Sequence, residues 1–234
     1  MENVVFASYF NNVPDPQRDV IWNSQPDGLF PLINSVVNKN IQIKIFHDCF
    51  NRPPVIENCD WIRVEGTADY TPTVYRWIVY NNYLQRVKTK HEKIFCVDST
   101  DVEMLSNPFS KIEKDTLYSG SEYKWKMRDK PLLKKKKKKL FLAPDFMSII
   151  ENYSEQVMLN AGIIGGNVNI VYEFIEKVAG LHKKYSKNLK LSADMPVFNY
   201  VALKYFNDKV VTGYPIHTPF TDYCYDYNCW WKHK

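Results

Sequence analysis

The sequence has few cysteines, no long apolar run and no basic leader. Its five cysteines are an odd number and form no Cys-x-x-Cys pair, which argues against a zinc site and against a disulfide framework. Free thiols are typical of a reducing compartment. No apolar run approaches the ~20 residues that span a bilayer, and the start MENVVFASYF lacks the basic and then apolar pattern of a signal peptide. We therefore expect a cytoplasmic protein without a transmembrane segment, either alone or as part of a larger multidomain chain.

Positive charge is confined to one segment. The formal net charge is +5, and the six consecutive lysines from Lys134 to Lys139 outweigh it on their own. The rest of the chain is close to neutral, which argues against nucleic acid as a partner. The lysine run is either a solvated loop or a segment attracted to an anionic membrane surface or polyanion.

The overall composition is that of an ordinary globular protein. The chain has 234 residues, of which 45% are hydrophobic and 24% charged. This length suits one large α/β domain and is short for two full ones. Aromatic residues make up 15% of the chain; they build cores and also form the flat platforms on which sugars and bases stack.

The first half of the sequence alternates between strand-like and helix-like segments. Apolar and β-branched runs predict strands at 3–10, 41–48, 59–66 and 93–98. The spacing of apolar residues predicts helices at about 25–38 and at 72–87, the second with Thr71 or Thr73 as N-cap. This alternation predicts a mostly parallel sheet covered by helices, in which ligands bind at the carboxyl ends of the strands.

The second half is less regular. We expect a strand at 116–121 and helices at 149–157, 167–185 and 194–206, with the segment LNAGIIGG between the first two of these helices. The tail from Gly213 is rich in aromatic and turn-forming residues.

The most informative segment is FCVDSTDVEML, residues 95–105. An apolar strand delivers Asp98 and Asp101 into a turn, with Ser99 and Thr100 between them. Mg²⁺ and Mn²⁺ prefer carboxylate oxygens, and Mg²⁺ usually shares its shell with substrate phosphates. Two acidic residues at this spacing are also common as turn and helix-cap residues, so a metal site needs further partners.

Three later segments offer such partners. LNAGIIGG places glycines after Asn160, and glycines allow either a tight turn or the close approach of a ligand to the backbone. Asp194 stands at the start of a predicted helix, where an N-cap role is the alternative. His217 lies in a loop between prolines, either as polar surface or as a nitrogen ligand for Mn²⁺.

The order DSTDV, NAGIIGG, DMPVFN and then a C-terminal histidine resembles the metal-dependent glycosyltransferases with the A-type (GT-A) fold. The resemblance extends from Ser8 to His217 and includes a small viral member with similar ASYF and DPQR segments. Two features depart from the family. The acidic pair is DxxD here rather than DxD, which leaves open whether Asp98 contacts the metal or the ribose, and the lysine run has no counterpart.

The resemblance implies a nucleotide-diphospho-sugar transferase fold over residues 1–234. A nucleotide-binding part would cover about 1–110 and a sugar and acceptor part about 111–234. Mn²⁺, or Mg²⁺, would be held by Asp101, His217 and Asp98. Tyr9 would stack on the base, and Asp48 would read it. The full set of donor-binding residues that the resemblance implies is Ala7, Ser8, Tyr9, Arg18, Asp48, Arg76, Asp98, Ser99, Asn160 and Gly162.

By the same resemblance, a hexose or deoxyhexose passes from a nucleotide-diphosphate sugar, with uridine as the expected base, to a hydroxyl of a glycan or glycoprotein. In an inverting enzyme Asp194 would be the catalytic base that deprotonates the acceptor, and in a retaining one it would position sugar hydroxyls. A nucleotidyltransferase acting on sugar phosphates is one alternative, but the loop NNVPDPQRD lacks the expected glycines. A non-catalytic carbohydrate-binding protein is the other, and it would need no acidic pair at a strand end.

Overall fold

The computed structural model describes residues 2–11, 13–14, 21, 25–65, 69–128, 144–186, 194–219 and 225–233 of the chain. Two predictions made from the sequence lie outside the described residues, namely the donor contact of Arg18 and the nature of the segment from Lys134 to Lys139.

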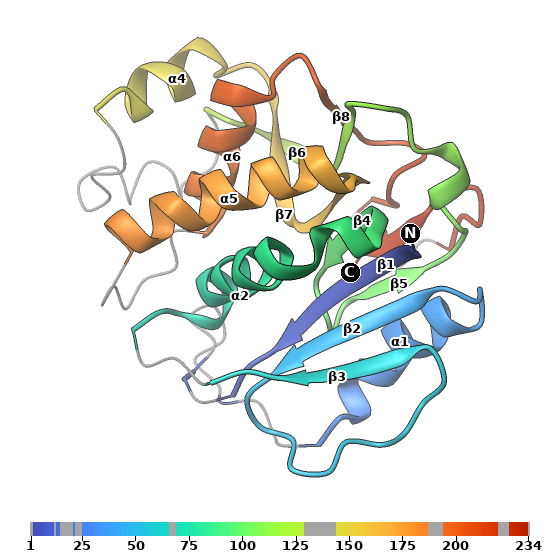
Figure 1. Cartoon of the computed structure of the whole chain (residues 1–234). Helices are drawn as coiled ribbons and strands as arrows, with labels where there is room; N and C mark the ends of the chain where they lie inside the picture. The colour runs from blue at the N-terminus through green and yellow to red at the C-terminus, as the bar shows by residue number, and fades with distance from the viewer. Residues whose placement is uncertain are drawn as a thin grey trace.

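A seven-stranded sheet forms the centre of the molecule, in the order β3-β2-β1-β4-β7-β6-β8 (Figure 1). The strands β3, β2, β1 and β4 run parallel to one another, as do β6 and β8, whereas β7 runs antiparallel to both β4 and β6. The sheet consists of β1 (Glu2–Tyr9), β2 (Gln42–His47), β3 (Cys59–Arg63), β4 (His91–Val97), β6 (Leu117–Lys126), β7 (Val157–Asn167) and β8 (Val210–Thr212).

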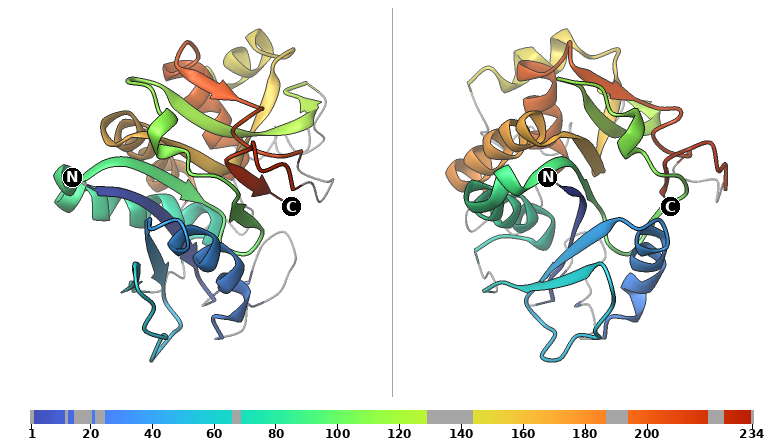
Figure 2. Two further views of the ribbon diagram at one scale, coloured as in Figure 1. Left: turned by 90° about the vertical axis from the view of Figure 1, so that its right-hand side faces the viewer. Right: turned by 45° about the vertical axis from the view of Figure 1, so that its right-hand side comes forward.

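Helices cover both faces of this sheet (Figure 2). One face carries α2 (Pro72–Val87), α4 (Phe146–Asn152), α5 (Val168–Tyr185) and α6 (Asp194–Tyr205). The other carries α1 (Phe30–Val37) and a small sheet of β5 (Val102–Met104) and β9 (Trp231–His233). Short 3₁₀ helices occupy Asp27–Leu29, Lys88–Lys90 and Phe109–Lys111. None of the described helices is long and apolar enough to cross a bilayer.

The alternation of side chains explains the two cores. In β1, Val4 and Phe6 pack against the four-helix face, while Val5 and Ala7 pack against the α1 face. A strand that is buried on both faces has no polar side to show, so its sequence is a continuous apolar run. The protein is therefore an α/β protein with a mostly parallel mixed sheet flanked by helices, as the sequence predicted, and it is compatible with a Rossmann-like fold.

Two predictions for the second half were wrong. The helix expected at 149–157 is α4, which ends at Asn152, and LNAGIIGG is the body of strand β7 rather than a turn between helices. The glycines of this segment serve packing: a Cβ on Gly165 would lie 2.2 Å from a ring carbon of Phe95 on the neighbouring strand β4. Small residues therefore let β7 lie as a buried central strand beside an aromatic side chain.

Strand β7 is irregular where it meets the acidic turn. Its pairing with β6 jumps from Ser119↔Ile164 to Gly120↔Asn160, so residues 161–163 bulge out of that ladder. On its other side, the Gly162 carbonyl accepts a hydrogen bond from the backbone N–H of Asp98, with an N···O distance of 2.8 Å. Bulges of this kind re-aim side chains next to functional sites, and this one holds the first residue of the acidic turn.

Candidate metal centre

The two aspartates of the acidic turn meet a histidine from the end of the chain. Ligand-type atoms of Asp98, Asp101 and His233 all lie within 4.8 Å of one another. The turn follows β4, and β5 starts one residue after Asp101. Because Val102 of β5 pairs with His233 of β9, this ladder brings the histidine to the turn. Two carboxylates and an imidazole are a donor set suited to Mn²⁺.

Gly162 borders the same centre. A Cβ built on it would lie 2.6 Å from Cε1 of His233, 2.7 Å from Oδ2 of Asp98 and 2.9 Å from Oδ1 of Asn160. All three distances are shorter than an ordinary van der Waals contact, so the position beside Gly162 accommodates a hydrogen atom but not a side-chain carbon. The chain thus leaves a cradle that a side chain would fill, and the residues present fit a small divalent cation.

His233 is held in the protonation state that a metal requires. Its side chain is buried, with 3% of the residue exposed. Burial lowers the pKa of His233 to about 4, although the nearby charge of Asp98 opposes this shift. The imidazole is therefore neutral at neutral pH, and a neutral imidazole is the form that binds metal.

His217, predicted to be the nitrogen ligand, does not belong to this cluster. Its Nδ1 donates to the carbonyl oxygen of Thr218 at 2.7 Å, and its Nε2 accepts from the backbone N–H of Ser121 at 3.0 Å. Both ring nitrogens are thus engaged within the fold. His217 also forms a β-bridge with Trp231, so it supports the strand that carries His233. Sequence reasoning missed His233 because two histidines in one tail are equivalent until strand pairing is known.

A buried ionic chain lies behind the acidic turn. Arg76 of α2 donates from Nη1 to Oδ1 of Asp98 and from Nη2 to Oδ2 of Asp194, the latter at 2.7 Å. Oδ1 of Asp194 accepts from the indole N–H of Trp77 at 2.6 Å. Arg76 and Asp194 are 7% and 5% exposed. The structure therefore brings together Arg76, Asp98 and Asp194, which were predicted separately, and adds Trp77, which has no motif in the sequence.

Burial and these contacts shift the pKa values of Arg76 and Asp194. Burial disfavours a charged guanidinium, but the carboxylates of Asp194 and Asp98 outweigh it and raise the pKa of Arg76. Burial raises the pKa of Asp194, while Arg76 and Trp77 pull it back. An arginine between two carboxylates compensates charge that the interior would otherwise not tolerate.

Asn160 connects Gly162 to a further carboxylate. Its Oδ1 accepts from the backbone N–H of Gly162 at 2.6 Å, and its Nδ2 donates to Oε1 of Glu122 at 3.0 Å. Glu122 belongs to β6, and its negative charge opposes the lowering of the pKa of His233. Asn160 and Gly162 therefore border the cluster. Glu122 was missed because an acidic residue within a strand carries no signal of its own.

The remaining predicted donor contacts sit at the carboxyl ends of β1, β2 and β4. These strands are parallel neighbours, so their ends share one edge of the sheet. Ala7 is buried, Ser8 is half-buried near the end of β1, and Ser99 is half-buried in the acidic turn.

Tyr9 stacks on Phe50 with ring centroids 5.4 Å apart, so one face of its ring is already covered. Asp48 accepts from the backbone N–H of Asn11 at 3.0 Å. Contact of these residues with a nucleotide stays a prediction.

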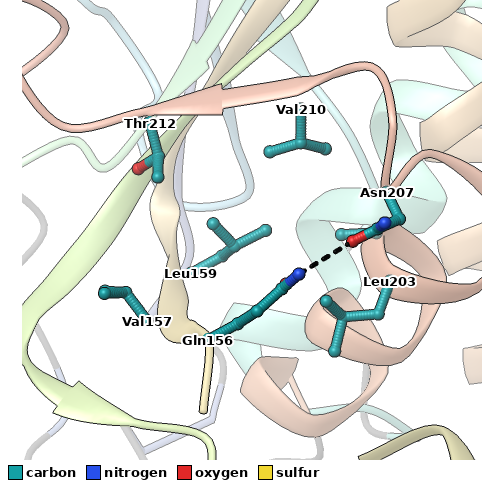
Figure 3. Close-up of a pocket in the computed structure, with 8 residues that line it drawn as sticks. Gln156, Val157, Leu159, Leu203, Asn207, Val210 and Thr212 are labelled. Carbon is teal, nitrogen blue, oxygen red and sulfur yellow. Dashed lines mark hydrogen bonds between the residues drawn. The ribbon is translucent and has the colours of Figure 1, made fainter. Parts of the chain in front are cut away.

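A cavity of about 290 Å³ lies elsewhere, beside β8 and α6 (Figure 3). Its lining includes Leu159, Leu203 and Val210, and its rim carries a hydrogen bond of 3.1 Å from Gln156 to Asn207. None of the residues predicted to bind donor or metal lines it. Leu159 and Asn160 are consecutive in β7, yet Leu159 lines this cavity and Asn160 borders the candidate metal centre.

No protein-family model matches the chain, and no curated protein matches it. Fold and site define it as an α/β protein with a candidate divalent-metal centre at the carboxyl end of a central strand.

Proposed function

We propose that the protein is a metal-dependent glycosyltransferase that moves a sugar from a nucleotide-diphosphate sugar, with UDP as the first nucleotide to test, to a hydroxyl of a glycan. The observation that carries this proposal is the convergence of Asp98, Asp101 and His233 beside Gly162. The resemblance of DSTDV, NAGIIGG and DMPVFN to the GT-A family directs it to glycosyl transfer rather than to another metal-dependent reaction.

The chain supplies candidate ligands for a cation within 4.8 Å of one another. A divalent ion bound here would neutralise the negative charge that builds up on a leaving diphosphate. Asp101 and Asp98 offer carboxylate oxygens, and His233 offers the lone pair of a buried neutral imidazole. The backbone bond from Asp98 to Gly162 keeps the start of the acidic turn against β7, so Asp98 is positioned before any substrate binds, which reduces the cost of ordering it.

The location of the centre supports a nucleotide donor. In open α/β sheets ligands bind in the crevice beyond the carboxyl ends of the strands. Asp98 follows β4 directly, while Ser8 and Asp48 stand at the ends of the parallel neighbours β1 and β2. A nucleotide that lies across these ends would bring its diphosphate to the acidic turn.

The proposal is tested by melting the protein with Mn²⁺, with nucleotide-diphosphate sugars, and with both together. A ligand present at 100 times its Kd adds ~2.7 kcal/mol. That corresponds to roughly 5–10 °C in a chain of this length. We expect a smaller shift with Mn²⁺ alone and a shift of this size when Mn²⁺ and one of the sugars are combined. Asp101→Asn should lose the shift, and Asp208→Asn, at an exposed acidic residue outside the cluster, should keep it.

Product analysis then identifies the reaction. Release of a nucleoside diphosphate together with a glycosylated acceptor marks glycosyl transfer, whereas release of pyrophosphate from a nucleoside triphosphate and a sugar phosphate would mark a nucleotidyltransferase. A wild-type protein whose melting temperature responds to neither Mn²⁺ nor any nucleotide sugar would contradict the proposal.

A further inference from the structure

We propose that Arg76 and Asp194 are positioning residues of the metal centre, which act through Asp98 by holding its carboxylate so that Oδ2 faces Asp101 and His233. The inference rests on the proposed metal-dependent function and assigns these two residues a role other than direct contact with the donor or the acceptor.

The two oxygens of Asp98 have different partners. Oδ1 accepts from Nη1 of Arg76, whereas Oδ2 lies 3.9 Å from Nε2 of His233. Oδ2 is also the atom that a Cβ on Gly162 would meet. The guanidinium therefore engages Oδ1 on one side of the carboxylate, while Oδ2 lies on the side of His233, so the bond from Arg76 fixes which oxygen of Asp98 faces the cluster.

Arg76 is itself fixed in place. Its Nη2 donates to Asp194 at 2.7 Å and to the carbonyl oxygen of Ala161 at 3.1 Å. A planar guanidinium that is bonded on both of its terminal nitrogens cannot rotate without breaking these bonds. Ala161 belongs to the bulge of β7 that also contains Gly162, so Arg76 ties helix α2 to the strand that borders the centre.

Asp194 completes the arrangement from α6. One oxygen accepts from Trp77 and the other from Arg76, and both donors belong to α2. With 5% of the residue exposed, its carboxylate is directed at α2. A base that deprotonates an acceptor hydroxyl must reach that hydroxyl, whereas a group that orients Arg76 needs only the contacts seen here.

The test uses Mn²⁺ alone, titrated into Arg76→Lys and Asp194→Asn and followed by the loss of the free-Mn²⁺ signal in electron paramagnetic resonance. Lysine keeps the charge but cannot bond Asp98 and Asp194 through a rigid fork. Asparagine keeps the shape and an acceptor for Trp77 but loses the charge that orients Arg76. Changing a residue that orients a metal ligand typically costs ~10–100-fold in metal affinity, and we expect a loss of this size in each variant.

Asp60→Asn is the matched control. It breaks another ion pair with a buried basic residue, Lys44–Asp60 at 2.5 Å, between β2 and β3. This variant should lower the melting temperature but leave the affinity for Mn²⁺ at the wild-type value. It therefore separates a loss of stability from a loss of orientation.

The double variant provides a second measurement. Because Arg76 and Asp194 both act through the carboxylate of Asp98, their combined effect on Mn²⁺ affinity should fall well short of the product of the single effects. If Arg76→Lys does not fold, Asp194→Asn alone still decides the matter. Wild-type affinity in Asp194→Asn, with altered binding only of a nucleotide sugar, would overturn the positioning role and favour direct contact with the donor. Absence of Mn²⁺ binding in the wild type would instead remove the metal centre and the proposed function.

Discussion

Replacing Gly162 with alanine tests the metal centre by sterics alone, because it changes no charge and removes no ligand. The added methyl group would meet His233 at 2.6 Å, Asp98 at 2.7 Å and Asn160 at 2.9 Å. To reach an ordinary contact distance of ~3.4 Å or more, each of these side chains must retreat by about 0.5–0.8 Å. Two of these side chains, His233 and Asp98, are candidate ligands, and the added methyl group would displace both of them.

The magnitude follows from the tolerance of metal coordination. Ligand distances in a metal site vary by only about 0.2 Å, so a displacement of half an ångström or more takes at least one ligand out of range. We expect the affinity of Gly162→Ala for Mn²⁺ to fall at least tenfold, which is ~1.4 kcal/mol. Overpacking costs typically ~1–3 kcal/mol of folding stability, which leaves the protein folded and measurable.

Two other glycines are matched controls in the same assay, which combines Mn²⁺ titration by electron paramagnetic resonance with thermal melting. A Cβ on Gly165 would lie 2.2–2.5 Å from the ring of Phe95, so Gly165→Ala should lose ~1–3 kcal/mol of stability through overpacking. It should keep its affinity for Mn²⁺. Gly180 is an exposed position in α5, and nothing lies within 4 Å of a Cβ there. Gly180→Ala should therefore gain up to ~1 kcal/mol from helix propensity.

One pattern would refute this reasoning. Suppose that Gly162→Ala binds Mn²⁺ as tightly as the wild type while its melting temperature falls as far as that of Gly165→Ala. Then Gly162 serves packing alone, and the metal does not bind where the three candidate ligands meet.

Three further predictions concern buried groups. His233→Ala should abolish Mn²⁺ binding. His217→Ala should lower the melting temperature, because it removes the bonds to Ser121 and Thr218, but it should leave the affinity for Mn²⁺ within about twofold of the wild type. An equal loss of affinity in both variants would contradict the assignment of His233 as the ligand. Burial lowers the pKa of His182 to about 3, from ~6.5 in the unfolded chain, so the unfolded state binds the extra proton between these values. Stability should fall as the pH decreases through this window, by up to ~1.4 kcal/mol per unit, and His182→Gln should flatten the slope between about pH 6 and about pH 4 in urea unfolding. Glu103→Gln should lower the free energy of unfolding by ~1–3 kcal/mol in urea, because it leaves the ammonium of Lys232 buried without its anionic partner at 2.9 Å. The side chain of Glu103 is 23% exposed, and an unchanged unfolding midpoint would show that water replaces the carboxylate.

Much of the fold could be predicted because its signals are local. An apolar strand that ends in acidic residues is recognisable within ten letters, and helix α2 begins at Pro72 and ends at Val87, as the spacing of its apolar residues predicted. Segment LNAGIIGG misled because glycine usually marks a turn. Only the neighbouring Phe95 shows why small residues are needed within a buried strand.

The sequence by itself determined the α/β class, the acidic turn after β4 and the residue types from which a metal centre can be built, because each depends on the order and spacing of nearby residues. Tertiary structure alone decided which side chains meet. Pairing of β5 with β9 selects His233 over His217, and the packing of α6 against α2 joins Asp194 to Arg76 across 118 positions. Such meetings depend on strand pairing and helix packing between distant segments, and the identity of a residue does not encode its distant partner.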